Sequence, residues 1–196
     1  MTPRKVARQE YPTIAFSTPK KFNAWLKKYH AKATGIWVRF YKKGSGVKTV
    51  TYAQALDDAL CFGWIDSQAN KLDEKSYIQK FTPRRAKSIW SKRNREHVAR
   101  LIKEKRMMPA GARQLEAAKS DGRWDNAYDS PKNITVPEDF MKLLIKNKRA
   151  HDFYTTLTRA NIYAIAWRLQ TAKRPETRNR WVQRILKMLS KGETFH

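Results

Sequence analysis

The sequence has few of the features that mark secreted or membrane proteins. It contains one cysteine, Cys61, so an internal disulfide is impossible and the class of small disulfide-stabilised domains is excluded. The N-terminal residues MTPRKVARQEYP have no apolar segment behind their basic residues. The longest stretch without charge or strong polarity, near residues 59–65, is too short to cross a bilayer. We therefore expect a cytoplasmic protein without a transmembrane segment.

Enzyme and metal signatures are also missing. The chain has no glycine-rich phosphate loop and no nucleophile elbow. Its histidines, His30, His97, His151 and His196, stand singly and not at the spacing of metal ligands. We expect no metal and no cofactor, and the pattern favours a binding protein over an enzyme. A catalytic site built from residues far apart in the chain stays open, because such sites depend on geometry and not on chain order.

Acidic residues are scarce. Lys and Arg total 42 against 17 Asp and Glu, which leaves a net charge of +25. The surplus lies in residues 1–32, 82–106 and 146–196, with net charges of +7, +8 and +9, whereas residues 33–81 and 107–145 carry +2 and −1. Nucleic acid, an anionic membrane surface and a basic proteome are three explanations for such a surplus. Its concentration in three segments favours a polyanion partner.

The pattern of apolar residues predicts an α+β fold. Apolar residues make up 41% of the chain and aromatic residues 12%, enough for a core. Thr18 and Pro19 are a typical N-cap and first residue for a helix that runs to Tyr29. A second helix is expected at 52–62. Strands are expected at residues 36–41, 47–51, 64–71 and 76–81, with the first two forming a hairpin across a Lys-Lys-Gly-Ser-Gly turn.

The second half of the chain reads as all-helical. Helices are expected at 87–105, at 109–122, after a capping box of Thr135 and Glu138, and at 150–157, 161–172 and 175–190. The prediction is a basic tail at 1–15, a compact α+β domain with an antiparallel sheet at 16–106, and a helical region at 107–196. Whether the helical region is separate or packs on the α+β domain as one unit stays open.

One segment, residues 81–94, combines a strand end, a helix start and many cations. Unsatisfied N–H groups at a helix start attract anions, and arginine adds paired donors. We therefore predict an anion site there. Its residues are Arg84, Arg85, Lys87, Ser88, Ser91, Lys92, Arg93 and Asn94, with Arg123 from a later motif. The alternative is a solvated basic loop with an ordinary helix cap.

Two further motifs place tryptophan beside a carboxylate. Aromatic rings next to arginine can stack nucleic-acid bases, although tryptophan is also a common core residue. The aromatic and orienting candidates are Trp64, Asp66, Trp90, Trp124, Asp125 and Tyr128. Asp66 and Asp125 are either a carboxylate pair for acid–base chemistry or salt-bridge partners of nearby arginines.

Long ordered motifs connect the chain to a known family. ALCFGWIDSQ, YIQKFTPRRAKSIWSKRN, the M-x-PAG run at Met107–Gly111, DGRWDNAYD and AKRPETRNRW resemble the YdeI/OmpD-associated family, also labelled bacteriocin-protection proteins. This family is described as related to the YjbR/CyaY-like superfamily. The resemblance implies an α+β domain followed by helices, a link to bacteriocin protection or stress, and a protein partner in envelope stress. It supplies no reaction, cofactor or catalytic residue.

Two function classes follow from these observations. The first is a non-enzymatic protein that binds nucleic acid or another polyanion through a basic surface, which requires the cations to gather on one face. The alternative is an enzyme or binding protein for a small anionic metabolite. It would use Arg84, Arg85, Arg123 and Ser91 as a clamp and Asp66 as an acid or base, and it requires the GWID, TPRR, SKRN and GRWD motifs to meet in one pocket.

Overall fold

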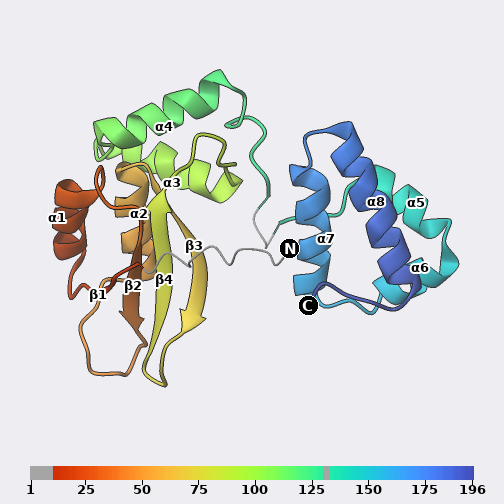
Figure 1. Ribbon diagram of the computed structural model, residues 1–196, viewed down its shortest axis with the longest axis horizontal. Coiled ribbons are helices and arrows are strands. Elements are labelled where there is room, and N and C mark those ends of the chain that lie inside the picture. The colour runs from red at the N-terminus through yellow and green to blue at the C-terminus, as the bar shows by residue number, and fades with distance from the viewer. Residues whose placement is uncertain (1–10, 130–132) are drawn as a thin grey trace, which may run out of the picture. The chain divides into compact units, whose positions relative to one another are not determined.

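The computed structural model describes residues 11–129 and 133–196. It confirms the α+β class, with a four-stranded sheet and helices in the first half and helices in the second (Figure 1). The chain forms two compact units, residues up to 88 with 96–125, and residues 89–95 with 126–196. The boundary expected from the sequence, between residues 106 and 107, stays a prediction.

The sheet of the first unit has the strand order β1-β2-β4-β3. Its strands are β1 (Thr13–Ala15), β2 (Ile36–Tyr41), β3 (Trp64–Lys71) and β4 (Ser76–Pro83). β1 runs parallel to β2, and the other two pairs are antiparallel. Residues 13–15 of the expected basic tail therefore form a strand, whereas residues 1–10 lie outside the described part of the chain.

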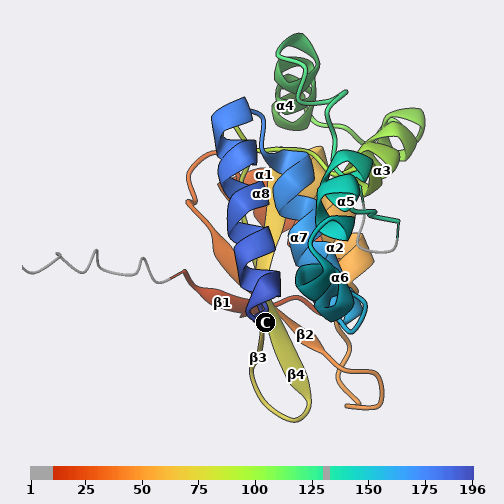
Figure 2. The same cartoon turned by 90° about the vertical axis from the view of Figure 1, so that its right-hand side faces the viewer.

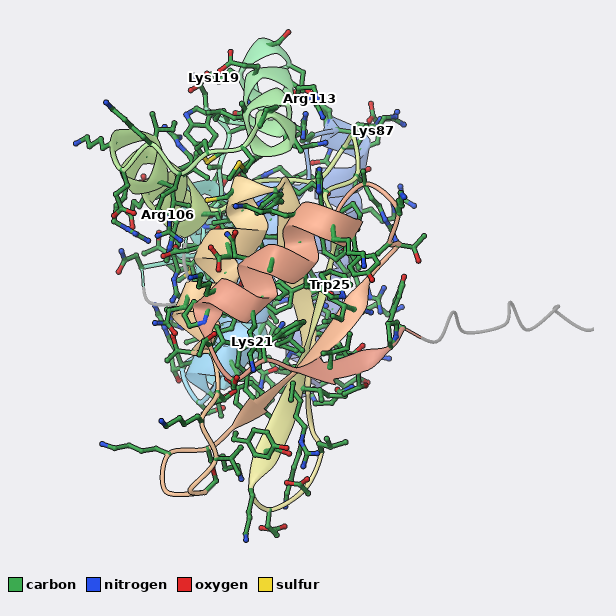
Figure 3. The ribbon with its side chains drawn as sticks, turned by 90° about the vertical axis from the view of Figure 1, so that its left-hand side faces the viewer. Lys21, Trp25, Lys87, Arg106, Arg113 and Lys119 are labelled. Atoms are coloured by element: carbon green, nitrogen blue, oxygen red, sulfur yellow. The ribbon has the colours of Figure 1, made fainter. Side chains whose placement is uncertain are left out.

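Helices α1 (Pro19–Tyr29) and α2 (Tyr52–Cys61) cover one face of this sheet (Figures 1 and 3). α1 begins as predicted, because the Thr18 side chain accepts a hydrogen bond from the Lys21 N–H. α2 begins with a full capping box between Thr51 and Gln54. Phe22 and Leu26 of α1 are fully buried, so this face holds the core of the unit.

The hairpin predicted between residues 36–41 and 47–51 is wrong. Residues 47–51 form no strand, and β2 instead pairs with β1 and β4. Two contacts explain the difference. Val50 is buried and donates its N–H to the Phe16 carbonyl, and Thr51 is already committed to capping α2. The glycine-containing turn was a correct signal for a chain reversal but not for strand pairing.

Two more helices, α3 (Lys92–Lys103) and α4 (Pro109–Ser120), follow the sheet. The M-x-PAG run fixes the start of α4 against the end of α2. Met108 donates its N–H to the Cys61 carbonyl at 3.1 Å, and Pro109 occupies the first turn. A Cβ on Gly111 would lie 2.2 Å from the same carbonyl oxygen. Glycine is therefore required there for the close approach of the two helices.

Ion pairs join α2 to α3 and to the residues that follow it. Asp57 accepts hydrogen bonds from His97 Nδ1 at 2.8 Å and from Arg100 Nη2 at 2.6 Å. Asp58 accepts from Arg106 at 3.1 Å and from Asn23 at 3.0 Å. Burial raises the pKa of Asp57, but the bonds from Arg100 and His97 outweigh it and hold that pKa below its ordinary value. Burial dominates at Asp58 and raises its pKa.

Asp57 should therefore make the first unit sensitive to acid. A carboxylate with a lowered folded-state pKa stabilises the fold above its unfolded pKa, and this contribution is lost as pH falls through the folded value. We expect Asp57→Asn to cost about 1–3 kcal/mol at neutral pH and to flatten the loss of stability below about pH 4. The raised pKa of Asp58 has the opposite effect, because its contribution to the stability of the fold increases as pH falls. Urea unfolding from neutral to acid pH measures both effects.

A surface pair provides the control for this prediction. Glu116→Gln removes an exposed carboxylate that pairs with Lys119 on α4, and we expect less than about 1 kcal/mol from it. A variant at Asp57 with the same acid dependence as the parent protein would contradict the assignment.

The second unit is built on helices α5 (Glu138–Ile145), α6 (Lys148–Tyr154), α7 (Arg159–Thr171) and α8 (Pro175–Ser190), shown in Figure 2. α8 packs on α6 and α7, and α5 packs on α6. Eight buried residues form the core: Phe140, Leu144, Ala150, Ile165, Leu169, Val182, Ile185 and Leu189. In the described ranges, no helix is both long and apolar enough to cross a membrane.

The capping box predicted for Thr135 and Glu138 does not form. α5 begins at Glu138 itself, with Pro137 at the cap position and no side-chain cap bond. Pro137 has a fixed φ and no N–H, so the chain before it stays extended. The Thr135 carbonyl instead accepts a hydrogen bond from the Gln170 side chain.

Candidate functional site: a cation stripe on helix α8

The cations predicted at residues 84–88 begin directly after β4. Arg84 is only 5% exposed, and its N–H donates to the Gly63 carbonyl at 2.9 Å. Arg85 and Lys87 are exposed. The Ser88 hydroxyl accepts the Arg85 N–H at 3.1 Å, so it serves a local turn. Arg85 and Lys87 are thus the two cations of this stretch that face solvent.

The residues predicted at 91–94 form the start of α3. The Ser91 hydroxyl accepts the Asn94 N–H at 3.1 Å, which is an N-cap bond. Lys92 pairs with Asp129 at 2.7 Å, and its N–H donates to the Tyr128 carbonyl. Arg93 is exposed. Ser91 therefore caps α3 and Lys92 forms an ion pair, and both contacts lie within the second unit.

Arg123 is a buried connecting residue, with 6% of its surface exposed. Its Nε donates to both oxygens of Asp121 at 2.8 and 2.6 Å, and its Nη1 donates to the Ser88 carbonyl at 2.9 Å. The motif DGRWD thus ties the end of α4 to the loop after β4.

The aromatic and acidic candidates divide by burial. Trp64 is 1% exposed and Trp90 is 2% exposed, so both rings are core side chains. Trp124 and Tyr128 are half-buried. Asp66 accepts a hydrogen bond from the Tyr52 hydroxyl at 2.7 Å, and Asp125 is exposed. A ligand role for these candidates stays a prediction.

Only part of the predicted motif cluster is brought together within one unit. GWID and TPRR lie side by side, because Trp64 pairs with Pro83 and Ile65 with Thr82 in the β3–β4 ladder. Arg123 of GRWD reaches Ser88. SKRN belongs to the second unit.

Cations of the first unit are spread over several elements. Lys21 on α1, Lys87 after β4, Arg106 after α3, and Arg113 and Lys119 on α4 lie apart and point in different directions (Figure 3). Two of them are also paired, Arg106 with Asp58 at 3.1 Å and Lys119 with Glu116 at 3.3 Å. These five cations therefore come from four different parts of the first unit.

Helix α8 gathers cations instead. Arg180, Arg184, Lys187 and Lys191 are all exposed and follow one another at intervals of four, three and four residues. At 3.6 residues per turn, these positions lie on one side of the helix and its C-cap. The buried residues of α8, Val182, Ile185 and Leu189, lie on the other side. We call the four residues the α8 stripe.

The α8 stripe lacks carboxylate partners. Within residues 11–129 and 133–196, none of its four cations forms an ion pair. Arg178, on the same helix but outside the stripe, pairs with Asp139 at 2.6 Å. α8 itself contains one acidic residue, Glu176, in its first turn, four residues before Arg180.

Two hollows flank Arg184. One of about 250 Å³ is lined by Thr177, Arg180, Trp181 and Arg184. The other, of about 380 Å³, is lined by Arg184, Lys187, Met188, Lys191, Glu193, Thr194 and Phe195. Each stripe cation therefore lines at least one of the two hollows, and one carboxylate, Glu193, lines the larger hollow with them.

Arg168 of α7 adds a fifth cation beside the stripe. Its guanidinium lies 3.8 Å from the ring centre of Phe195 and 5.4 Å from that of Trp181. Its Nη1 donates to the Ala164 carbonyl at 2.8 Å. Burial lowers the pKa of Arg168, and the positive charge of Arg184 lowers it further. Arg168 and Arg184 are thus close enough for their charges to repel each other.

Sequence reasoning predicted the helix but missed the stripe. Residues 175–190 were expected to be helical, and α8 has those bounds. The signal for the stripe is present in RWVQRILKMLSK, where Arg or Lys recurs every three or four residues. A search for dense charge finds residues 84–93 first, because it ignores which cations share a helix face.

Comparisons with known proteins agree with a two-part chain. The family model for the domain of unknown function DUF8412 matches residues 14–114. The model described as "Bacteriocin-protection, YdeI or OmpD-Associated" matches residues 133–192, which include α5–α8 and the α8 stripe. The resemblance to the YdeI/OmpD-associated family is thereby confirmed for this segment. No curated protein and no solved structure matches the chain.

Proposed function

This chain belongs to the family of the domain of unknown function DUF8412, and we propose that it is a non-enzymatic protein that binds the phosphate backbone of nucleic acid through the α8 stripe. The observation that carries the proposal is the row of Arg180, Arg184, Lys187 and Lys191 along two hollows, without a carboxylate partner among the described residues.

An unpaired stripe of this kind opposes folding. Like charges three or four residues apart destabilise a helix by about 0.2–0.5 kcal/mol per pair. The stripe contains three such neighbouring pairs, so it costs about 1 kcal/mol in the free protein. An anionic ligand removes this repulsion on binding, which supports a polyanion as the partner.

The dimensions of the stripe fit a phosphate backbone. At about 1.5 Å of rise per residue, Arg180 and Lys191 are separated by about 16 Å along the helix axis. A duplex advances by about 3.4 Å per nucleotide of each strand, so the stripe spans about five nucleotides. Three or four phosphate contacts are therefore within its reach.

A small anionic metabolite is the competing ligand class. The larger hollow has three cations and the Thr194 hydroxyl, which would suit a single phosphate group. The stripe, however, continues past Arg184 into the second hollow. This extension favours a polymer of phosphates over one small anion.

Salt dependence of binding tests the proposal. We expect the affinity for a labelled oligonucleotide duplex to fall with salt, with a slope of about −2.7 to −3.6 for log affinity against log salt concentration if there are three or four contacts. A mononucleotide at equal phosphate concentration should compete poorly. A slope flatter than about −1, no binding at about 50 mM salt, or full competition by the mononucleotide would contradict it.

We extend the proposal to the superfamily of the first unit and to the cellular location and biological role of the protein. A relationship of the first unit to the YjbR/CyaY-like superfamily is supported by its compact sheet with helices on one face. Cytoplasmic location agrees with a nucleic-acid ligand and with a single, buried cysteine. A role in bacteriocin protection or stress, and a protein partner there, would follow from binding and not from catalysis.

A further inference from the structure

The sheet of the first unit has a second face that carries a different combination of side chains. In β2, Ile36, Val38 and Phe40 point to the core, so Trp37, Arg39 and Tyr41 point to the opposite face. β4 adds Ile78 and Lys80 to that face, because they pair with Arg39 and Trp37. α1 and α2 lie on the core side (Figure 3).

Each aromatic ring on this face has a cation beside it. Lys80 Nζ lies 5.4 Å from the ring centre of Trp37, and the Arg39 guanidinium lies 4.6 Å from that of Tyr41. All four residues are partly exposed. Arg39 also pairs with Asp73 at 2.6 Å, which holds it in place over Tyr41 and leaves Lys80 as the cation available to a ligand.

We propose that this Trp37–Tyr41 face, defined by Trp37, Arg39, Tyr41, Ile78 and Lys80, stacks the bases of single-stranded nucleic acid. Partly exposed aromatic rings on a sheet, each with a cation over it, can stack unpaired bases through the ring or through the planar guanidinium, and the cations also attract the backbone. Trp37 and Tyr41 are four residues apart on one strand, about 13 Å, so they contact different nucleotides. A duplex keeps its bases stacked on each other and gains nothing from these rings.

This inference goes beyond the α8 stripe and does not depend on it. The two surfaces belong to different units of the chain and use different chemistry. Charge contacts at the α8 stripe set the salt slope, whereas stacking at the Trp37–Tyr41 face discriminates single strands from duplex. The two proposals can therefore fail separately.

The test uses the full chain and a single-stranded oligonucleotide that contains 2-aminopurine, whose fluorescence falls when the base stacks. We expect quenching on binding to the parent protein. Trp37→Leu with Tyr41→Leu should abolish the quenching and weaken single-strand binding by on the order of tenfold for each ring, with little change in duplex binding or salt slope. Trp37→Phe with Tyr41→Phe keeps two rings and should retain most of the quenching.

Trp25→Leu with Tyr29→Leu is the matched control, because it removes the same pair of residue types at the same spacing from α1 on the other side of the sheet. Circular dichroism at the assay temperature verifies that each variant is folded. Unchanged quenching in the folded Trp37→Leu, Tyr41→Leu variant would overturn the proposal. An equal loss of quenching in the Trp25→Leu, Tyr29→Leu control would also overturn it. So would a protein that binds an unfolded polypeptide on this face and does not bind the oligonucleotide.

Discussion

Changing Arg180, Arg184, Lys187 and Lys191 together to Gln is expected to remove most nucleic-acid binding. The parent protein should lose on the order of 100-fold in affinity between about 50 mM and about 200 mM salt, if four phosphates are neutralised. The variant should bind weakly at the lower salt concentration. Its slope of log affinity against log salt concentration should be less steep by about 3 to 4. Fluorescence anisotropy with a labelled duplex measures both quantities.

This loss should occur without unfolding. The four side chains are exposed and lie opposite the core residues of α8, so their truncation leaves no cavity. Removing the like-charge pairs should stabilise α8 by about 0.2–0.5 kcal/mol for each pair. The variant is therefore expected to unfold at the same temperature as the parent protein or at a slightly higher one.

Four exposed lysines of the first unit provide a control with the same change in net charge. Lys20, Lys21, Lys27 and Lys32 belong to α1 or follow it, and none forms an ion pair with a described residue. Changing them to Gln should alter affinity by only a fewfold, through the general field of the protein. If this control weakened binding as much as the α8 variant, the basic surplus would act as a diffuse charge and the stripe would not be a site.

Gly111→Ala is expected to destabilise the first unit by about 3 kcal/mol. In an ordinary helix this substitution stabilises by up to about 1 kcal/mol, because alanine has the higher helix propensity. At Gly111 the new Cβ would lie 2.2 Å from the Cys61 carbonyl oxygen and 2.8 Å from that of Leu60. Both obstacles are backbone atoms of α2, so relief requires α4 to move away from α2.

Cys61 reports this effect for the first unit alone. It is the single cysteine of the chain and is buried, and burial raises the pKa of its thiol to about 11. The folded protein should therefore react slowly with a thiol reagent near pH 8, since little thiolate is present. Gly111→Ala should increase the labelling rate by on the order of 100-fold, as the open state becomes more populated.

Ala117→Gly is the control on the same helix. Ala117 is exposed in α4, so this change should cost only about 1 kcal/mol through helix propensity. The contact with α2 would be disproved if Gly111→Ala protected Cys61 better than the parent protein, because propensity would then outweigh the predicted clash.

The sequence alone determined the features that depend on neighbouring residues. Thr18 with Pro19 started α1, and the apolar period of residues 175–190 defined α8. Caps and helix faces act within a turn or two, so their signals survive without knowledge of the fold. The overall α+β class followed from the same local patterns.

Only the tertiary structure decided which groups were used up by distant partners. Lys92 looked like a ligand group, but Asp129, which is far from it in the chain, forms an ion pair with it. Arg123 is buried and donates to the distant Ser88 carbonyl, and β2 pairs with β1 and β4 instead of residues 47–51. Such pairings join residues that the chain brings together only on folding, and a charge leaves the binding surface once a partner neutralises it. The four cations of the α8 stripe remain available because, among the described residues, none of them forms an ion pair with a carboxylate.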